Sequence, residues 1–329
     1  LIHLFSKPDI SSLESQFTNL VTSPVRPILW TVVFMIFNAF IVMSGVKKGI
    51  EKYSKIMMPV LFLMIVILMI QSFTLPGAAK GVEFLVKPDF SKINTQVVLA
   101  ALGQAFFSLS LGMGCMITYG SYIPSRENLS KLSFTTAISD TLFAILAGLA
   151  IMPAVFAFGI SPQEGPGLVF IVLPRIFAQI PLGNLFAVIF FIILFIAAIT
   201  SVISLLEVIT AYVTERLKMK RTIAVLLISL MVTVCASFSS LSQGVLKEVK
   251  LFGRTIFDFF DHLSANILLP LGGLFIVLFV GWYMKKSQVY DEFTNQGTLK
   301  GTLFGAFYFI IRYVAPVAIA AVFLDLILR

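Results

Sequence analysis

The stretch GQAFFSLSLGMG, residues 103–114, lies inside a run from Ile93 to Ser125 that contains no charged residue. As one α-helix, the roughly 30 residues 93–123 would be about 45 Å long, whereas the hydrocarbon core of a membrane is about 30 Å thick. Weak helix formers gather near the middle of this run: Ser108, Ser110, Gly112 and Gly114. Because such residues release the backbone and their hydroxyls re-satisfy it locally, we predict two half-helices joined by an unwound turn.

Two interpretations of this turn are open at the level of sequence. An unwound backbone is tolerated at membrane depth where protein or a wet cavity surrounds it, and its free carbonyls and helix ends form a site for ions and solutes. Alternatively, Gly112 and Gly114 form a packing face that lets another helix approach closely.

The composition is that of a polytopic membrane protein. Hydrophobic residues make up 58% of the chain, charged residues 12%, and the mean hydropathy is +0.99. The formal net charge of +8 comes from basic residues dispersed between apolar segments, which argues against nucleic-acid binding. The two cysteines and two histidines form no metal or redox motif.

We predict eight spanning segments, each near or above the roughly 20 residues that a span needs. They are residues 28–46, 56–76, 94–122, 132–158, 184–213, 222–243, 256–284 and 301–325. Lys and Arg are modestly more frequent in the loops after the first, third, fifth and seventh spans, so these loops are expected to be cytoplasmic and both chain ends extracellular.

The start of the chain bears on its completeness. Residues 1–27 are polar, with a short amphipathic helix expected outside the bilayer, and they contain no signal peptide. A protein that begins in the cytosol would need an odd number of spans before this chain. We therefore expect that the protein's own beginning is missing here.

Residues 159–183 are apolar but contain four prolines, so no part of them is expected to cross the membrane. A hairpin of two short helices that covers a vestibule is one interpretation. An interfacial loop on the lipid headgroups is the other.

Asp140 is the most informative ionisable residue. It lies about 13 Å along its helix from Lys131, near mid-depth, where a charge costs about 2.5–3.5 kcal/mol on insertion scales. A bound cation would compensate it, as would protonation or an arginine. We predict an ion site, since intramembrane carboxylates are usually functional.

Other polar residues within the predicted spans indicate a function less specifically than Asp140 does. Thr200 and Ser201 are adjacent hydroxyls that suit a hard monovalent cation, although such side chains more often bond to their own helix backbone. Glu207, nearer the cytoplasmic end, is expected to be solvated. Arg312 is expected to pair with a carboxylate or to snorkel, with no chemistry assigned.

Several segments resemble the neurotransmitter:sodium symporter family, specifically its bacterial amino-acid transporters. GQAFFSLSLGMGCMITYGSYI, ISDTLFAILAGLAIMPAVFAFG, GPGLVFIVLPRIF and FIAAITSVISLLEV resemble the sixth and seventh helices, the extracellular lid and the eighth helix. PVRPILW, GVKKGIEKYSKIMMPVLF and LPGA resemble the fourth and fifth helices, and RYVAP the eleventh. The resemblance covers essentially the whole chain, and the family's first three helices have no counterpart in it.

The resemblance implies an all-α inverted-repeat fold with substrate and sodium bound at mid-membrane between broken helices. Residues 28–92 would be the last two helices of the first repeat, residues 93–284 the complete second repeat, and residues 285–329 a cytoplasmic loop with the final helix. This chain alone, without half of the site, is expected to be inactive.

By the same resemblance, the substrate would contact six residues: Phe107, Ser108, Ser110, Met113, Ser201 and Leu205. One sodium ion would be held by Ser108 and Asp140. The other would be held by the Ala197 carbonyl with the hydroxyls of Thr200 and Ser201. The family usually has Asn at the Asp140 position, and a shift of one residue would place Ser139 there instead.

Asp261, together with Asp258, resembles the family's acidic extracellular gate, although solvation at the surface explains both residues almost as well. The implied function is sodium-coupled import of hydrophobic L-amino acids without chloride. Two rival functional classes differ from this one in the residues or the flux that they require. An intramembrane aspartyl protease would need a second mid-depth carboxylate facing Asp140, and the sequence contains none. A channel that uses residues 103–114 as a pore element would differ in its non-saturating flux.

Overall fold

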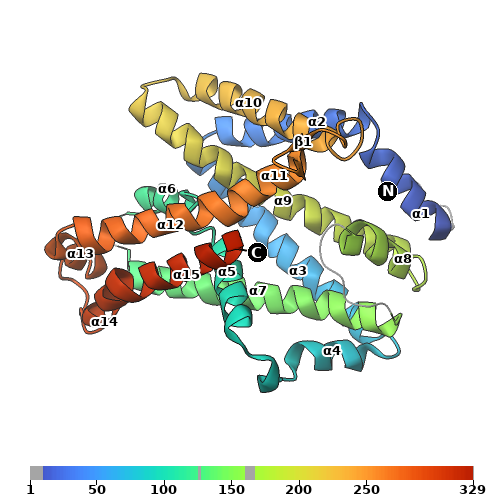
Figure 1. Cartoon of the computed structure of the whole chain (residues 1–329), viewed down its shortest axis with the longest axis horizontal. Helices are drawn as coiled ribbons and strands as arrows, with labels where there is room; N and C mark the ends of the chain where they lie inside the picture. Colours follow the sequence, from blue (N-terminus) through green and yellow to red (C-terminus); the bar gives the residue numbers. More distant parts are fainter. Residues whose placement is uncertain (1–9, 125–126, 160–166, 329) are drawn as a thin grey trace. The chain divides into compact units, whose positions relative to one another are not determined.

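The computed structural model describes residues 10–124, 127–159 and 167–328. These residues are almost entirely helical (Figure 1). By their internal contacts they divide into two compact units. The first unit runs to Pro88 and continues with Leu142–Phe257, and the second consists of Asp89–Thr141 and Asp258–Arg329.

Seven helices of the described chain are long and apolar enough to cross a membrane. Four of them are regular: α2 (Arg26–Met43), α7 (Leu129–Ala157), α9 (Gly183–Arg216) and α10 (Arg221–Leu241). The other three contain π-helical turns: η2 (Val46–Glu51) with α3 (Lys52–Phe73); α11 (Ile256–His262), η5 (Leu263–Leu268), α12 (Leu269–Leu278) and η6 (Phe279–Tyr283); and α14 (Phe304–Phe309), η7 (Ile310–Val314) and α15 (Ala315–Leu328). The remaining predicted span, 94–122, is the broken one, formed by α5 (Thr95–Ser108) and α6 (Cys115–Tyr122).

In the first unit, α2 and α10 pack side by side in antiparallel directions, each also contacting α9. The hydroxyl of Thr31 lies 3.5 Å from that of Ser240 at one end of this pair, and Arg221 contacts the Val42 carbonyl at the other. The short helix α4 (Ala78–Val86) packs on α7, where a Cβ at Gly81 would lie 2.5 Å from the Pro153 Cα. Only glycine permits that approach.

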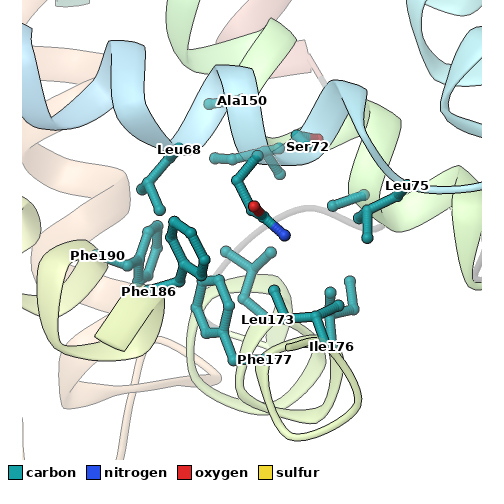
Figure 2. A pocket seen from close by; sticks show the side chains of 13 residues that line it. Leu68, Ser72, Leu75, Ala150, Leu173, Ile176, Phe177, Phe186 and Phe190 are labelled. Carbon is teal, nitrogen blue, oxygen red and sulfur yellow. The ribbon is translucent and has the colours of Figure 1, made fainter. Parts of the chain in front are cut away.

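The apolar core of the first unit lies between α3, α7, α9 and the short helix formed by η4 (Leu168–Val172) and α8 (Leu173–Phe177). A cavity of about 30 Å³ remains there, and Figure 2 shows the rings of Phe177, Phe186 and Phe190 along one side of it. Its polar lining consists of Gln71 and the buried Ser72.

Of the two short helices expected in residues 159–183, the described chain contains one, at residues 168–177, and residues 160–166 lie outside the described chain. The choice between a lid and an interfacial loop stays a prediction. The short helix expected within residues 1–27 is α1 (Ile10–Val21), whose Phe17 ring stacks on Phe170 at 5.5 Å.

The second unit contains η3 (Phe90–Lys92), α5, α6, the start of α7, α11 from Asp258 onward, and the elements from η5 to α15, among them the short helix α13 (Lys286–Phe293). Phe304 and Tyr308 of α14 pack with Val289 of α13 in a separate apolar cluster.

One element departs from the all-α expectation. Strands β1 (Lys250–Leu251) and β2 (Arg254–Thr255) form a two-residue antiparallel hairpin in the loop before α11. Phe252 and Gly253 make its turn with positive φ values of 51° and 80°. A hairpin this short has no periodic pattern for the sequence to reveal.

Candidate ion and substrate site

The helix containing residues 103–114 is broken, as predicted. α5 ends at Ser108 and α6 begins at Cys115, with an unwound turn between them. Three residues of this turn have left-handed backbone angles: Ser110 (φ 54°), Gly112 (φ 85°) and Gly114 (φ 81°). Glycine adopts such angles without strain, so at Gly112 and Gly114 the backbone of the turn costs little conformational energy.

Among the described residues, the turn leaves a series of backbone carbonyls without a backbone N–H donor. In the described chain, no backbone N–H donates to the carbonyls of residues 108–113. Bonding resumes with the Gly114 carbonyl, which accepts from the Thr118 N–H at 2.9 Å. Free carbonyls at mid-membrane are the ligands that discontinuous transporter helices offer to sodium.

The packing interpretation of the glycines also holds, at Gly112. A Cβ on this residue would lie 2.2 Å from the Leu269 carbonyl oxygen and 2.9 Å from the Gly273 nitrogen, both on α12. The close approach is mutual, because a Cβ on Gly272 would lie 2.4 Å from the Gly112 oxygen. The two interpretations of the sequence, an unwound turn and a glycine packing face, are therefore compatible, because the turn is unwound and also packs closely against α12.

Asp140 of α7 reaches this turn. The Ser108 hydroxyl at the end of α5 donates a hydrogen bond of 2.5 Å to the Asp140 Oδ2. Asp140 is half-buried, whereas the neighbouring Ser139 is exposed. A carboxylate, a hydroxyl and unpaired carbonyls thus gather at one place, which is a donor set of oxygen atoms suited to a hard cation.

A second group of oxygen atoms lies on α9, in the other compact unit. The hydroxyls of Thr200 and Ser201 both donate to the Ala197 carbonyl, at 2.9 Å and 3.1 Å. Both hydroxyls thus bond to the backbone of their own helix, as such side chains often do. These bonds bring the two hydroxyl oxygens and the Ala197 carbonyl oxygen together within about one helical turn. Each hydroxyl oxygen keeps a lone pair for a cation while its hydrogen is donated.

The other candidate residues are placed as follows. The side chains of Phe107 on α5 and Leu205 on α9 are exposed, whereas Ser110 and Met113 are half-buried. Asp258 and Asp261 lie on α11 and are exposed. Ser201 and Leu205 belong to the first unit and the turn to the second, so a joint pocket remains a prediction.

The expectation of a solvated Glu207 is wrong. This residue is fully buried, with 0% exposure, and its carboxylate forms a bidentate ion pair with Arg221 at 2.5 Å and 3.1 Å. The same guanidinium donates to the Val42 carbonyl from Nε at 3.0 Å and from Nη2 at 2.8 Å. The pair therefore joins α9, α10 and the end of α2.

Sequence reasoning missed this pair because Arg221 was assigned to a cytoplasmic loop. The short connection between α9, which ends at Arg216, and α10, which begins at Arg221, could have predicted it, because two helices joined so closely form a helical hairpin. An arginine at the start of the second helix of such a hairpin can reach back to a carboxylate in the last turns of the first.

A family model described as the Sodium:neurotransmitter symporter family matches residues 14–329. The chain belongs to this family. It is accordingly a multi-pass membrane transporter and not an enzyme.

Relatives and a solved structure agree with this assignment. The chain is 40% identical to the uncharacterized sodium-dependent transporter YhdH of Bacillus subtilis over 316 residues, which are 94% of this chain and 69% of YhdH. It is 39% identical to an uncharacterized sodium-dependent transporter of Haemophilus influenzae, covering 92% of this chain and 66% of that protein. The structure also matches the crystal structure of MhsT in complex with L-phenylalanine, with a TM-score of 0.86 and 42% sequence identity. The match covers 99% of this chain and 75% of the MhsT chain. The protein is thus a sodium-dependent transporter with the fold of MhsT.

Proposed function

We propose that the complete protein is a symporter that couples sodium entry to the import of hydrophobic L-amino acids. Family membership supports sodium coupling, and the bound L-phenylalanine of MhsT, at 42% identity, supports the substrate class. The observation that carries the proposal is the hydrogen bond between Ser108 and Asp140 beside the unpaired carbonyls of the broken helix.

The proposed substrate pocket is built on the unwound turn. Ser108 and Ser110 would contact the polar part of the amino acid, while Phe107 and Met113 would face its apolar side chain. On the family resemblance, Ser201 and Leu205 of α9 are proposed as further substrate contacts. Transport would proceed by alternating access around this site, as in other carriers with discontinuous helices.

Two sodium ions are proposed, one in each compact unit. One would bind at Ser108 and Asp140, and the other at the Ala197 carbonyl with the hydroxyls of Thr200 and Ser201. Desolvating an ion costs several kcal/mol even after relaxation, so negative charge must lie nearby. The substrate carboxylate and Asp140 would supply one charge each and balance the two ions.

This charge balance leads us to propose transport without chloride. A relative of 29% identity, covering 80% of this chain and 46% of its own length, is the sodium- and chloride-dependent GABA transporter 2 of Rattus norvegicus. In chloride-dependent relatives we expect a neutral side chain at the Asp140 position and a chloride ion in place of the carboxylate.

Asp261, with Asp258, is proposed to belong to an acidic gate at the outer end of its span, and both chain ends are proposed to be extracellular. The partners that the proposal requires are the amino-acid substrate, sodium and the lipid bilayer.

The proposal is tested by uptake of labelled L-phenylalanine into liposomes that contain the complete protein. We expect saturable uptake that requires an inward sodium gradient and continues when gluconate replaces chloride. Uptake that does not saturate would favour the channel alternative, and uptake without sodium would contradict the symporter.

A further inference from the structure

A cluster of cationic and aromatic side chains lies where the seventh and eighth predicted spans approach each other, inside the second unit. The Arg312 guanidinium of η7 lies 4.7 Å from the centre of the Trp282 ring, 5.6 Å from that of Tyr313 and 5.8 Å from that of Tyr308. The Lys286 ammonium group lies 5.5 Å from the Tyr308 ring centre. Two positive charges therefore share one aromatic residue.

Hydrogen bonds from side chains to backbone carbonyls join the two helices at this cluster. The Trp282 Nε1 donates to the Arg312 carbonyl at 2.9 Å, and the Tyr308 hydroxyl donates to the Gly281 carbonyl at 3.2 Å. A Cβ on Gly281 would lie 2.9 Å from the Arg312 Cα, so the two helices are in direct contact here. Both helices are π-helical at this level, a local distortion that is frequent at functional sites.

The charge of this cluster is not compensated within the described chain. No carboxylate there forms an ion pair with Arg312 or Lys286. Of the five N–H donors of an arginine, Arg312 uses one, in a long contact of 3.4 Å from Nη1 to the Tyr308 hydroxyl. Its Nε is buried without a partner. The Nη groups keep further N–H donors for which the described chain provides no acceptor, so an acceptor-rich anion that reaches them would stabilise this arrangement.

The position of the cluster indicates what kind of anion can reach it. Gly281 lies just before the end of its span at Tyr283, and Arg312 is level with Gly281. Trp282 and Tyr283 are exposed over 56% and 80% of their surface. Exposed Trp and Tyr side chains at a span end are typical of the headgroup level of a membrane, and basic pockets between helices there bind anionic headgroups.

We propose that Arg312 and Lys286, framed by Trp282 and Tyr308, bind the phosphate of an anionic phospholipid such as phosphatidylglycerol. The phosphate oxygens would accept the N–H donors that Arg312 leaves unused, while the exposed rings of Trp282 and Tyr283 would lie among the headgroups. The site is independent of the proposed ion and substrate site, because none of its residues belongs to the broken helix, α7 or α9.

The test is native mass spectrometry of the complete protein in detergent, titrated with phosphatidylglycerol, phosphatidylcholine or inorganic phosphate. We expect preferential binding of phosphatidylglycerol, and Arg312→Gln and Lys286→Gln should each raise its Kd about fivefold, the equivalent of one basic residue near an anionic lipid surface. The matched control is Lys131→Gln, which removes an exposed lysine near the start of α7 and should leave this Kd unchanged.

Equal binding of phosphatidylcholine and phosphatidylglycerol would overturn the proposal, as would an equal loss of binding in Lys131→Gln. Competition by inorganic phosphate at the same concentration would also overturn it, since the site would then take a free anion. If Arg312→Gln does not fold, Lys286→Gln decides the matter, because Lys286 is exposed and begins α13 outside the spans.

Discussion

Replacing Asp140 by Asn removes one negative charge from the turn and little else. The two side chains have nearly the same shape, and the amide oxygen of Asn can still accept the hydrogen bond that Ser108 makes at 2.5 Å. The substitution therefore separates the electrostatic role of the carboxylate from its role in packing.

The expected magnitude follows from the proximity of Asp140 to the proposed sodium ion. Unit charges about 4 Å apart attract each other by about 4 kcal/mol at an effective dielectric constant of 20. The carboxylate and the ion must both be partly desolvated to meet, and that cost offsets part of the attraction. We expect a net loss of about 1.4–2.8 kcal/mol, which is about tenfold to a hundredfold in sodium affinity.

The assay is the sodium dependence of L-phenylalanine uptake by liposomes in gluconate medium. The Asp140→Asn variant should need about tenfold to a hundredfold more sodium for half-maximal uptake. Adding chloride should restore part of the loss, because the anion can take the place of the missing carboxylate. A shift in the sodium requirement, rather than a uniform loss of uptake, distinguishes this effect from misfolding.

The control variant is Asp291→Asn, which removes an exposed carboxylate on α13 and should leave the sodium requirement unchanged. Wild-type sodium dependence of Asp140→Asn in gluconate medium would refute the reasoning and remove Asp140 from the ion site. Loss of wild-type uptake when chloride is withdrawn would do the same.

Three further predictions concern stability and topology. Gly112→Ala should lower the free energy of unfolding by about 2–5 kcal/mol, because a Cβ at a φ of 85° is strained and would lie 2.2 Å from a carbonyl oxygen of α12. Thermal unfolding in detergent measures this, and Gly120→Ala, whose Cβ would meet nothing within 4 Å, should be nearly neutral. Glu207→Ala should lower the free energy of unfolding by about 3 kcal/mol, the low end for a broken buried pair, because the Arg221 guanidinium loses its carboxylate but is 28% exposed and keeps the Val42 carbonyl. An unchanged unfolding temperature would show that the ion pair contributes nothing. Single cysteines at Lys218 and Lys250 should react with impermeant reagents only from the cytoplasmic and the extracellular side, respectively, and the reverse pattern would invert the proposed topology.

The sequence by itself was sufficient for the spans and for the broken helix. Hydropathy and length are local properties, and seven of the eight predicted spans correspond to helices of the described chain that are long and apolar enough to cross a membrane. Their bounds agree to within three residues, except that the second begins at Gly49 instead of residue 56. The break at residues 109–114 was equally local, because weak helix formers within an overlong apolar run cannot continue one helix. The family resemblance added a pattern of motifs that the family model bears out over residues 14–329.

Only the tertiary structure decided which polar groups meet. It pairs Ser108 with Asp140, which are 32 positions apart, and it buries Glu207 against Arg221 although both looked like groups at a helix end. It also places Arg312 among three aromatic rings instead of beside a carboxylate. The physical reason is that the partner of each of these three residues lies on another helix, and the sequence of one helix does not contain that partner.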